Sequence, residues 1–577
     1  MPQYDNAAIA TVLDTFGDLL EVAGADRYRF LSYHKAAHAI RAWDEDISVT
    51  AAQGRLTDIP GVGAKLAAAI DSIMATGTFP ELEAVVADLP ASITELMRIP
   101  GLGPKKAKAL YDDLAITSVD DLEEAIAEGR LDGLSGFGPK TVQNIVTGIE
   151  RFRTMSARIL LADALPLAEK LVAELAAVSG VVSAAYAGSV RRMKETVGDI
   201  DVLVAAEDAE AVMAAVRSLP LVTGVVASGE TKTSIMTTAG LQVDVRVVPP
   251  RSWGAALQYF TGSAEHNVRT REIAKARGLK VSEYGVFQLD GSVRVAGETE
   301  EGVYTALGMA MPPPEVRENA GEIEIALDGR VPSLVTLADI RGDLHAHTDA
   351  TDGRSTLEQN REKAAQLGYE YLACSDHAYE LRMVGGLDER QLEEQWARID
   401  ELNARGDGPF LLKAIELNID DQGGVDYPPG LLAKFDLCIA SLHAGWNQSR
   451  EQVTARLLRA MENPYVDIIG HPTGRLLGRR DPFDLDMEAV LAKAGETGTI
   501  MEINASPDRL DLSDVHLRMA RRHGIRVAIS TDAHEATQFN FMRWGVATAR
   551  RGWMTPGDVL NAQPLEVLRT WLKHARA

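Results

Sequence analysis

Cysteine is almost absent from this chain of 577 residues: there are two, Cys374 and Cys438, and each lies within an apolar run. Two such residues do not make a disulfide framework, so we interpret them as packed core thiols in a reducing compartment. The amino terminus lacks the basic and apolar regions of a secretion signal, and no uncharged apolar run is long enough to span a bilayer. We therefore expect a cytoplasmic protein with no membrane-bound part.

Basic residues are also fewer than acidic ones. Lys and Arg number 59 against 83 Asp and Glu, which gives a formal net charge of −24. This charge argues against a protein that coats nucleic acid indiscriminately. Local contacts with DNA remain open, because metal-binding carboxylates raise the negative count while their ions offset it. The length predicts several domains of about 150 residues, and 46% hydrophobic with 25% charged residues is typical of a globular protein.

Three aspartates lie on two segments that read as neighbouring strands. In residues 199–204 apolar side chains alternate with Asp199 and Asp201, so period-2 geometry puts both carboxylates on one face. Residues 241–248 alternate in the same way and turn Asp244 outward. Like charges this close repel, and proteins commonly offset such repulsion by binding a divalent cation between the carboxylates. The pattern therefore predicts a metal site formed by these three aspartates.

Just upstream, the sequence offers groups suited to a phosphate tail. Gly188 allows a close approach of the backbone, Ser189 supplies a hydroxyl, and Arg192 follows one turn later. Three carboxylates, two Mg²⁺ ions and a triphosphate make a nucleotidyl-transfer site. The alternative, an Asp-x-Asp strand at a sheet edge, would explain two aspartates alone but not the third aspartate together with the Gly-Ser pair.

Before residue 160 a short motif occurs three times, in which Gly-x-Gly is followed two residues later by a lysine that opens a helix. Gly-x-Gly exposes backbone N–H groups at a helix amino terminus, where the helix dipole adds positive potential. Such a hairpin binds phosphate without reading bases. The segments resemble helix-hairpin-helix motifs and predict sequence-independent contacts with the DNA backbone. The residues are Gly61, Gly63 and Lys65, then Gly101, Gly103 and Lys105, then Gly136, Gly138 and Lys140.

Residues 6–45 are helical in pattern and interleave basic with aromatic side chains, among them Arg27, Tyr28 and Tyr33. Such a face can hold a phosphate backbone, and a helix with one solvated face explains the same pattern. Both interpretations stay open.

From residue 339 onward, apolar strand-like runs alternate with helical segments, and metal-ligand residue types follow the runs. Seven such units predict a β/α barrel, whose strand ends converge on one mouth. Isolated histidines are usually satisfied core or surface residues, but six of the chain's twelve lie at these strand ends. Together with three carboxylates they predict a multinuclear metal cluster. The residues are His345, His347, Asp352, His377, Glu416, His443, His471, Asp532 and His534.

Four motifs occur in order: Gly-Ser-x-x-Arg at 188–192, Gly-Asp-x-Asp at 198–201, Val-Asp-Val-Arg at 243–246 and Tyr-Phe-Thr-Gly-Ser at 259–263. With them, residues 1–315 resemble a family X DNA polymerase, the class of DNA polymerase β. The resemblance implies that the three aspartates hold Mg²⁺ or Mn²⁺ and that Asp244 accepts the proton of the primer 3′-hydroxyl. The implied nucleotide contacts are Gly188, Ser189, Arg192 and Gly198 for the phosphates, Tyr259, Phe260 and Gly262 for the sugar, and Asn267 and Arg271 for the nascent pair and template. Plain core aromatics at a helix end are the alternative for the Tyr-Phe pair.

One departure from that family concerns Ala69. Members with lyase activity carry a Schiff-base lysine in the helix after the first Gly-x-Gly, and here the position is alanine. Alanine cannot form an imine. We therefore expect no deoxyribose-phosphate lyase activity by the usual route.

The second half resembles the PHP family, named for polymerase and histidinol phosphatase, and matches all nine of its ligand positions. The resemblance implies a trinuclear site that holds Mn²⁺, Zn²⁺ or both, with Glu416 bridging two metals. Asp352 stands where other members have histidine, which favours Mn²⁺. Such a site lowers the pKa of a bound water and orients a phosphate ester.

The two resemblances together predict a multidomain protein with all-α helix-hairpin-helix regions, an α+β palm and thumb, and a distorted (β/α)7 PHP barrel. We expect a monomeric, nucleoid-associated repair polymerase that fills gapped or primer-template DNA with dNTPs, and a 3′-5′ exonuclease in the barrel. AP-endonuclease and 3′-phosphatase activities stay open. The alternatives are a PHP phosphoesterase with a vestigial polymerase and a non-catalytic scaffold for DNA ends. The expected domains are 1–90 and 91–160 (helical), 161–248 (palm), 249–315 (thumb), 316–338 (linker) and 339–577 (barrel).

Overall fold

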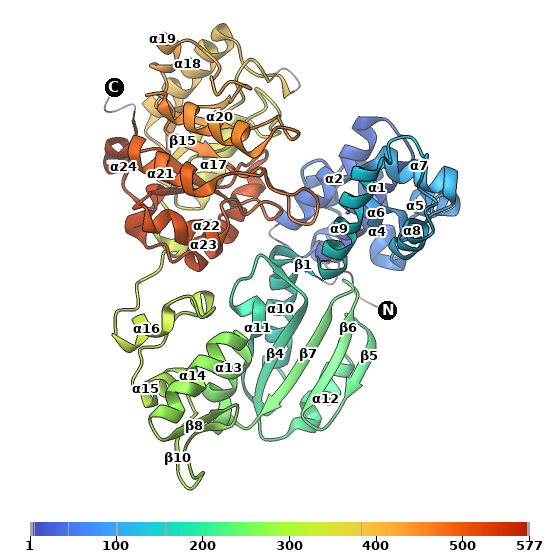
Figure 1. Ribbon diagram of the computed structural model, residues 1–577, viewed down its shortest axis with the longest axis vertical. Helices are drawn as coiled ribbons and strands as arrows, with labels where there is room; N and C mark the ends of the chain where they lie inside the picture. Colours follow the sequence, from blue (N-terminus) through green and yellow to red (C-terminus); the bar gives the residue numbers. More distant parts are fainter. Residues whose placement is uncertain are drawn as a thin grey trace. The chain divides into compact units, whose positions relative to one another are not determined.

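The chain divides into two compact units, Met1–Gly329 with Gly478–Arg480, and Arg330–Leu477 with Asp481–Ala577. This computed structural model describes residues 4, 6–43, 45–97, 99, 102–155, 158–381 and 384–573. Figure 1 follows the chain by colour and labels its elements. In the described part of the chain, no helix combines the length and the apolar character needed to cross a membrane.

The first unit opens with short helices whose amino ends are fixed by side chains such as Asp26, Asp46 and Ser118, each of which accepts a backbone N–H of the first turn. The helices are α1 (Asn6–Val22), α2 (Arg27–Ala42), α3 (Ile47–Ala52), α4 (Ala64–Thr76), α5 (Pro80–Asp88), α6 (Ile93–Met97), α7 (Pro104–Leu114), α8 (Val119–Ala127) and α9 (Pro139–Met155), with the 3₁₀ turn η1 (Leu56–Asp58).

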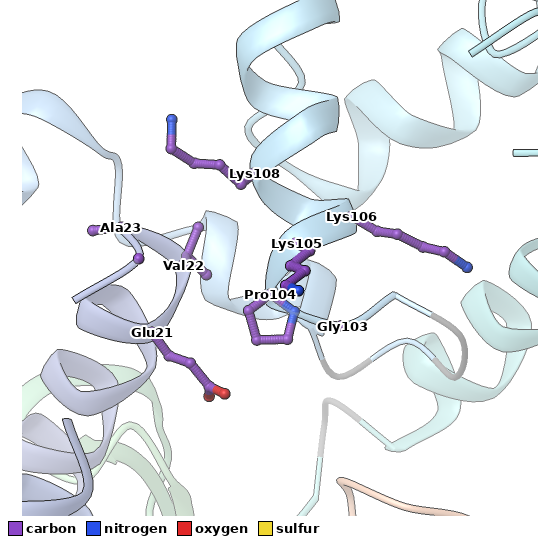
Figure 2. Close-up of a pocket in the computed structure, with 9 residues that line it drawn as sticks. Glu21, Val22, Ala23, Gly103, Pro104, Lys105, Lys106 and Lys108 are labelled. Atoms are coloured by element: carbon purple, nitrogen blue, oxygen red, sulfur yellow. The ribbon is translucent and has the colours of Figure 1, made fainter. Parts of the chain in front are cut away.

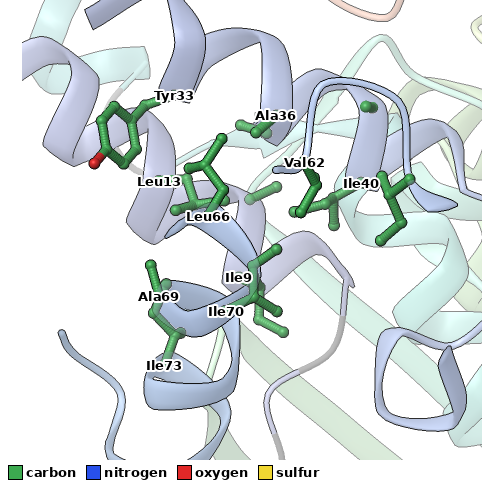
Figure 3. Close-up of a cluster of buried hydrophobic side chains, with 14 of the residues drawn as sticks. Ile9, Leu13, Tyr33, Ala36, Ile40, Val62, Leu66, Ala69, Ile70 and Ile73 are labelled. Carbon is green, nitrogen blue, oxygen red and sulfur yellow. The ribbon is translucent and has the colours of Figure 1, made fainter. Parts of the chain in front are cut away.

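Two apolar clusters hold these helices together. The first joins α1, α2 and α4 through fully buried residues such as Leu13, Ile40 and Ile70, which Figure 3 labels among the side chains of the cluster. The second gathers α6 to α9 and also takes Leu19 and Val22 from α1. Because α1 contributes to both clusters, the helices form one packed body.

The palm is a five-stranded sheet of order β2-β4-β7-β6-β5, in which β4 (Asp199–Ala206) and β7 (Gln242–Val248) pair in parallel. In β4 and β7 alternate residues such as Ile200 and Val243 are fully buried, which confirms the period-2 prediction. Figure 1 shows these strands side by side. The other elements are β1 (Ile159–Leu160), α10 (Leu161–Ala176), β2 (Val181–Tyr186), α11 (Gly188–Arg191), β3 (Thr196–Val197), α12 (Ala209–Arg217), β5 (Val222–Ser228) and β6 (Lys232–Thr237).

The thumb follows β7 and extends past residue 315. Residues 316–327, expected to belong to a linker, pack against it. Arg317 is fully buried, and the Glu322 carboxylate accepts a hydrogen bond from His266 Nδ1 at 2.7 Å. The elements are η2 (Pro250–Ser252), α13 (Trp253–Thr261), α14 (Ala264–Ala276), β8 (Leu279–Ser282), β9 (Gly285–Gln288), β10 (Arg294–Ala296), α15 (Glu300–Ala306), η3 (Pro314–Val316) and α16 (Glu322–Leu327).

The second unit is built on seven parallel strands in sequential order, which confirms the predicted (β/α)7 architecture. Between the last strand and the first, the barrel is joined by the Thr531 N–H, which donates to Asp343 at 3.2 Å, and by one isolated bridge, Ala346 with Ala533. The strands are β11 (Gly342–Asp343), β12 (Tyr371–Cys374), β13 (Phe410–Asn418), β14 (Leu437–Ser441), β15 (Ile468–Gly470), β16 (Ile500–Asn504) and β17 (Val527–Ser530).

These strands are short apolar runs that are buried along almost their whole length, as expected when helices cover a parallel sheet. The helical elements of this unit are η4 (Leu337–Asp339), α17 (Leu357–Gln366), α18 (Glu389–Arg405), α19 (Pro429–Leu432), α20 (Arg450–Glu462), α21 (Met487–Thr497), α22 (Asp514–Arg522), η6 (Ala536–Phe541), α23 (Met542–Arg551), η7 (Pro556–Asp558), η8 (Leu560–Ala562) and α24 (Leu565–Trp571).

Candidate functional sites

The three palm aspartates lie together. The parallel register of β4 and β7 sets Asp201 directly beside Asp244, and oxygens of Asp199, Asp201 and Asp244 all lie within 4.8 Å of one another. Burial, with the neighbouring charges of Asp199 and Asp244, raises the pKa of Asp201 to about 6. Three carboxylates that repel one another at this spacing fit a pair of divalent cations, which would relieve the repulsion.

The sequence did not single out Lys232 on β6, whose Nζ lies 2.6 Å from Asp244 Oδ2. Burial would raise the pKa of Asp244, but hydrogen bonds from Lys232, Ser234 and Gln242 outweigh it and lower that pKa. Asp244 is therefore held in its ionised form. The antiparallel pairing of β6 with β7 brings the lysine there, and no local motif marks it.

Gly188 is the point of closest approach to the carboxylates. Its φ is +57°, and a Cβ on it would lie 2.3 Å from Asp201 Oδ2. A side chain here would displace the aspartate, so glycine is required for both conformation and space. Ser189 is half-buried one residue further along α11, and Gly198 immediately precedes Asp199 at the start of β4.

Arg192 links this loop to the thumb. Its Nε donates to Glu318 at 3.1 Å, and its Nη1 donates to the Thr261 carbonyl. A Cβ on Gly262 would lie 3.0 Å from the same guanidinium. The Tyr-Phe-Thr-Gly-Ser segment and the Gly-Ser-x-x-Arg segment, which were predicted to act together, are thus neighbours in space.

The aromatic pair of the thumb is partly exposed, and one ring faces a cation of the palm. Tyr259 and Phe260 pack edge to face at 5.1 Å, and the Arg246 guanidinium lies 4.7 Å from the Phe260 ring centre. Asn267 is 9% exposed, and its amide is engaged by Gln258 and by the Tyr259 carbonyl at 2.9 and 2.7 Å. Arg271 is exposed on α14.

The first two Gly-x-Gly segments share the backbone geometry of their second glycine. Gly63 and Gly103 precede α4 and α7 with φ of −81° and −78°, and no side chain caps either helix. Gly61 and Gly136 both adopt positive φ, while Gly101 lies outside the described residues. Uncapped N–H groups at these helix starts are open to an anion.

A hollow of about 670 Å³ opens at the second of these hairpins, between the start of α7 and the end of α1. Gly103, Pro104, Lys105, Lys106 and Lys108 line it, and Figure 2 shows the lysines fanning out from α7. In the first hairpin, Lys65 pairs with Glu81 at 3.2 Å. In the third hairpin, Lys140 is exposed on α9. The amino end of α7 thus combines the helix dipole with cationic side chains.

Some aromatic residues of helix α2 are buried in the core, and others are exposed where they could contact a phosphate backbone. Tyr33 is 4% exposed and packs on Phe16 in the core, whereas Tyr28 is 84% exposed. Ala69 is 7% exposed within the same core (Figure 3).

The barrel brings all nine predicted ligand residues to one mouth. Three overlapping groups have ligand atoms within 4.8 Å of one another: His347, Asp352, His377 and His534; His345, His347 and Asp532; and His377, Glu416 and His443. His471 joins them, with Nε2 3.1 Å from Glu416 Oε1. Glu416 lies at the centre, because His345, His347, His377, His443 and His471 all approach it within 3.7 Å.

This cluster fits metal ions rather than a self-contained hydrogen-bond network. Among the described residues, His345 Nε2, His347 Nδ1, His443 Nε2 and His471 Nδ1 are buried nitrogens without a hydrogen-bond partner. Orphaned buried nitrogens are costly unless a ligand satisfies them. Burial would lower the pKa of His377, but Glu416 and Asp352 outweigh it and raise it to about 10. The pocket therefore favours cations, and several overlapping groups point to more than one.

Residues that the sequence did not predict as ligands orient the cluster. Glu502, fully buried on β16, accepts a hydrogen bond from His345 Nδ1 at 2.7 Å. Its other oxygen accepts the His471 N–H. Arg509 brings a cation to the mouth, with Nε 3.9 Å from Asp532 Oδ2. The signal for Glu502 in the sequence was its place after the apolar residues Ile500 and Met501 of a strand-like run, whereas Arg509 lies in a loop without a pattern.

The palm holds three convergent aspartates, Gly-x-Gly hairpins precede it, and a histidine-lined barrel of seven strands follows it. This combination defines a family X DNA polymerase fused to a PHP-type domain. Family models agree: a helix-hairpin-helix domain matches residues 4–79, a SAM-like helix-hairpin-helix tandem 93–151, and the DNA polymerase beta thumb 256–318. The three predicted hairpins are thereby confirmed.

The chain is 34% identical over 567 residues to the DNA polymerase/3′-5′ exonuclease PolX of Bacillus subtilis (strain 168), covering 98% of this chain and 99% of that protein. It therefore belongs to the PolX family. A probable phosphatase of Caldanaerobacter subterraneus subsp. tengcongensis is 34% identical over 203 residues, 33% of this chain and 75% of its own. A probable phosphatase of Thermoanaerobacter sp. (strain X514) is 29% identical over 230 residues, 38% of this chain and 89% of its own.

Proposed function

We propose that this chain is a DNA-directed DNA polymerase that also trims DNA 3′ ends as a metal-dependent 3′-5′ exonuclease. The observation that carries the proposal is the convergence of Asp199, Asp201 and Asp244 in a chain that aligns end to end with a PolX. Its substrates are then a primer-template, gapped DNA in particular, and dNTPs.

In the palm reaction, the primer 3′-hydroxyl attacks the α-phosphorus of the dNTP, a new phosphodiester forms, and pyrophosphate leaves. Divalent cations held by the three aspartates would lower the pKa of that hydroxyl and neutralise the charge that develops on phosphate. Asp244, kept ionised beside Lys232, accepts the hydroxyl proton. Gly188 lets the backbone approach the phosphates, and Arg192 exchanges Glu318 for the triphosphate tail.

For the barrel, the proposed reaction is hydrolysis of the terminal phosphodiester, which releases a nucleoside monophosphate and leaves a new 3′-hydroxyl. The metal ions would supply an activated water and stabilise the leaving oxygen. The nine ligand side chains would hold those ions, Glu502 fixes the orientation of His345, and Arg509 offers a cation for the phosphate. We propose Mn²⁺, with Zn²⁺ as the alternative, because imidazole and carboxylate ligands suit both.

The finer proposals follow from the same sites. Three hairpins placed to contact phosphate, together with a short-gap polymerase, fit a DNA repair enzyme, and we propose that it acts as a monomer. Ala69, buried where the lyase lysine would stand, supports the expectation of no deoxyribose-phosphate lyase activity. AP-endonuclease and 3′-phosphatase activities are chemically compatible with the barrel. The similarity to probable phosphatases favours phosphoester hydrolysis in the second half of the chain.

A labelled primer on gapped DNA, incubated with and without dNTPs in Mg²⁺ and in Mn²⁺, reads extension and trimming together. The double variant Asp199→Ala/Asp244→Ala should lose extension and keep trimming, and His345→Ala/His347→Ala should do the reverse. Extension that survives the palm variant would refute the polymerase site. Loss of both activities in either variant would contradict two separate sites.

The two alternatives predict other outcomes in the same assay. A PHP phosphoesterase with a vestigial polymerase would hydrolyse a free phosphomonoester in the absence of DNA and would never extend the primer. A DNA-end scaffold would bind gapped DNA and show neither activity with any metal. Intact ligand sets in both units weigh against the scaffold.

A further inference from the structure

Two aromatic side chains, Trp446 and Phe483, stack on each other in the loops that follow β14 and β15. The ring centres of Trp446 and Phe483 are 3.8 Å apart and their planes differ by 7°. Phe483 is 7% exposed, so it is the buried member of the pair, whereas Trp446 is 43% exposed. Trp446 is thus a flat aromatic ring that is partly exposed and backed by a buried ring, and aromatic rings of this kind favour stacking with a further ring.

The position of the pair is fixed by the backbone beneath it. Gly474 has a φ of +62°, and a Cβ on it would lie 2.7 Å from the Trp446 ring and 2.8 Å from the Phe483 ring. Only glycine leaves room for both rings. The Phe483 N–H donates to the Thr473 carbonyl at 2.8 Å, which ties its loop to the same turn.

This aromatic pair borders the metal cluster. Trp446 follows the ligand His443 by three residues, and Gly474 follows the ligand His471 by three. The Gly474 N–H donates to the His471 carbonyl at 2.9 Å. Three residues of extended chain span at most about 11 Å, so the Cα atom of Trp446 lies within about that distance of the Cα atom of His443. Gly474, against which both rings pack, belongs to the turn that starts at His471.

We propose that Trp446, backed by Phe483, is the platform on which the base of the 3′-terminal nucleotide stacks while its phosphodiester lies at the metal cluster. The proposal rests on the exonuclease function proposed above. Every base has a π face, so such a platform holds the nucleotide without reading sequence. Arg509, 3.9 Å from Asp532, would meet the phosphate charge on the metal side.

The test uses the full-length protein and two labelled single strands that differ only at the 3′ end, one with a normal terminal nucleotide and one with an abasic terminal unit. Stacking on an aromatic side chain is worth about 1–3 kcal/mol per base, and 1.4 kcal/mol is about ten-fold. The wild type should therefore trim the base-bearing end with a kcat/KM about five-fold higher or more. Trp446→Ala should remove this preference by slowing only the base-bearing substrate.

Matched variants separate stacking from folding. Trp446→Phe keeps an aromatic face and should keep most of the preference. Leu367→Ala removes an exposed apolar side chain just before β12, at the opposite end of the strands, and should behave like wild type. Metal content of Trp446→Ala, measured by mass spectrometry, should match the wild type.

If Trp446→Ala slows both substrates equally, or neither, the platform is refuted while the exonuclease stands. If the wild type trims neither strand with Mg²⁺, Mn²⁺ or Zn²⁺, the exonuclease function fails and the platform fails with it.

Discussion

Glu300 joins the palm to the thumb, and its replacement by glutamine should destabilise the first unit. Its two carboxylate oxygens accept hydrogen bonds from Arg191 at 2.7 and 2.9 Å, and Arg317 donates to the same group. Burial would raise the pKa of Glu300, but Arg191 and Arg317 outweigh it and lower it to about 2. From an ordinary value of 4.5 this corresponds to about 3 kcal/mol. Loss of one partner of a buried ion pair costs a similar amount, about 3–5 kcal/mol.

The assay is urea unfolding of the full-length protein at pH 7, followed by circular dichroism, for wild type, Glu300→Gln and the control Glu298→Gln. Glu298 is 60% exposed and pairs with Arg294 on the surface, so its loss should cost about 1 kcal/mol at most. Equal effects of the two variants would refute the buried-pair account.

The pH dependence gives a second check on the same variant. Because the pKa of Glu300 is lowered in the folded chain, its stabilisation is complete above the ordinary value of 4.5 and is lost as the pH falls through about 2. The difference in unfolding free energy between wild type and Glu300→Gln should therefore be constant from neutral pH to about 5 and shrink below it. A difference that persists at pH 2 would contradict the assignment to this carboxylate.

Three further predictions concern the sites. Gly188→Ala should lower kcat for primer extension about 100-fold by displacing Asp201, while Gly180→Ala, also at positive φ but with open space around its Cβ, should leave extension intact. Lys105→Ala should lower affinity for gapped DNA and reduce the slope of log K against log salt by about one, measured by fluorescence anisotropy; an unchanged slope would exclude a phosphate contact. Glu502→Gln should weaken metal binding about 10–100-fold in a chelator competition assay, and unchanged metal content would show that its bond to His345 does not position the ligand.

The palm and the barrel could be predicted from sequence because their ligands sit on regular strands. The alternation of apolar and acidic residues in β4 and β7 predicted that the three aspartates lie on one face of the sheet. The position of the other ligands near the ends of parallel strands predicted that they meet at the mouth of the barrel. Lys232 and Arg509 were missed because sheet pairing in one case and loop conformation in the other place them at the sites. Residues 316–327 read as a linker because they follow Pro312–Pro314 and are rich in acids. In the structure, Arg317 pairs with Glu300 and Glu322 with His266, and both partners are buried.

An acidic chain can bind DNA when its negative charges are concentrated at metal sites and its positive charges at the surfaces that contact DNA. The palm and the barrel concentrate carboxylates where cations are expected to offset them, so these residues contribute to the net charge of −24 without repelling a bound strand. At the start of α7, the helix dipole and the lysines act together over a short distance. Screening limits the reach of the remaining acidic surface to about 10 Å at moderate salt. Binding strength should then follow the hairpins and the metals rather than the overall charge, which is why removal of the metals should weaken DNA binding more than loss of one hairpin lysine.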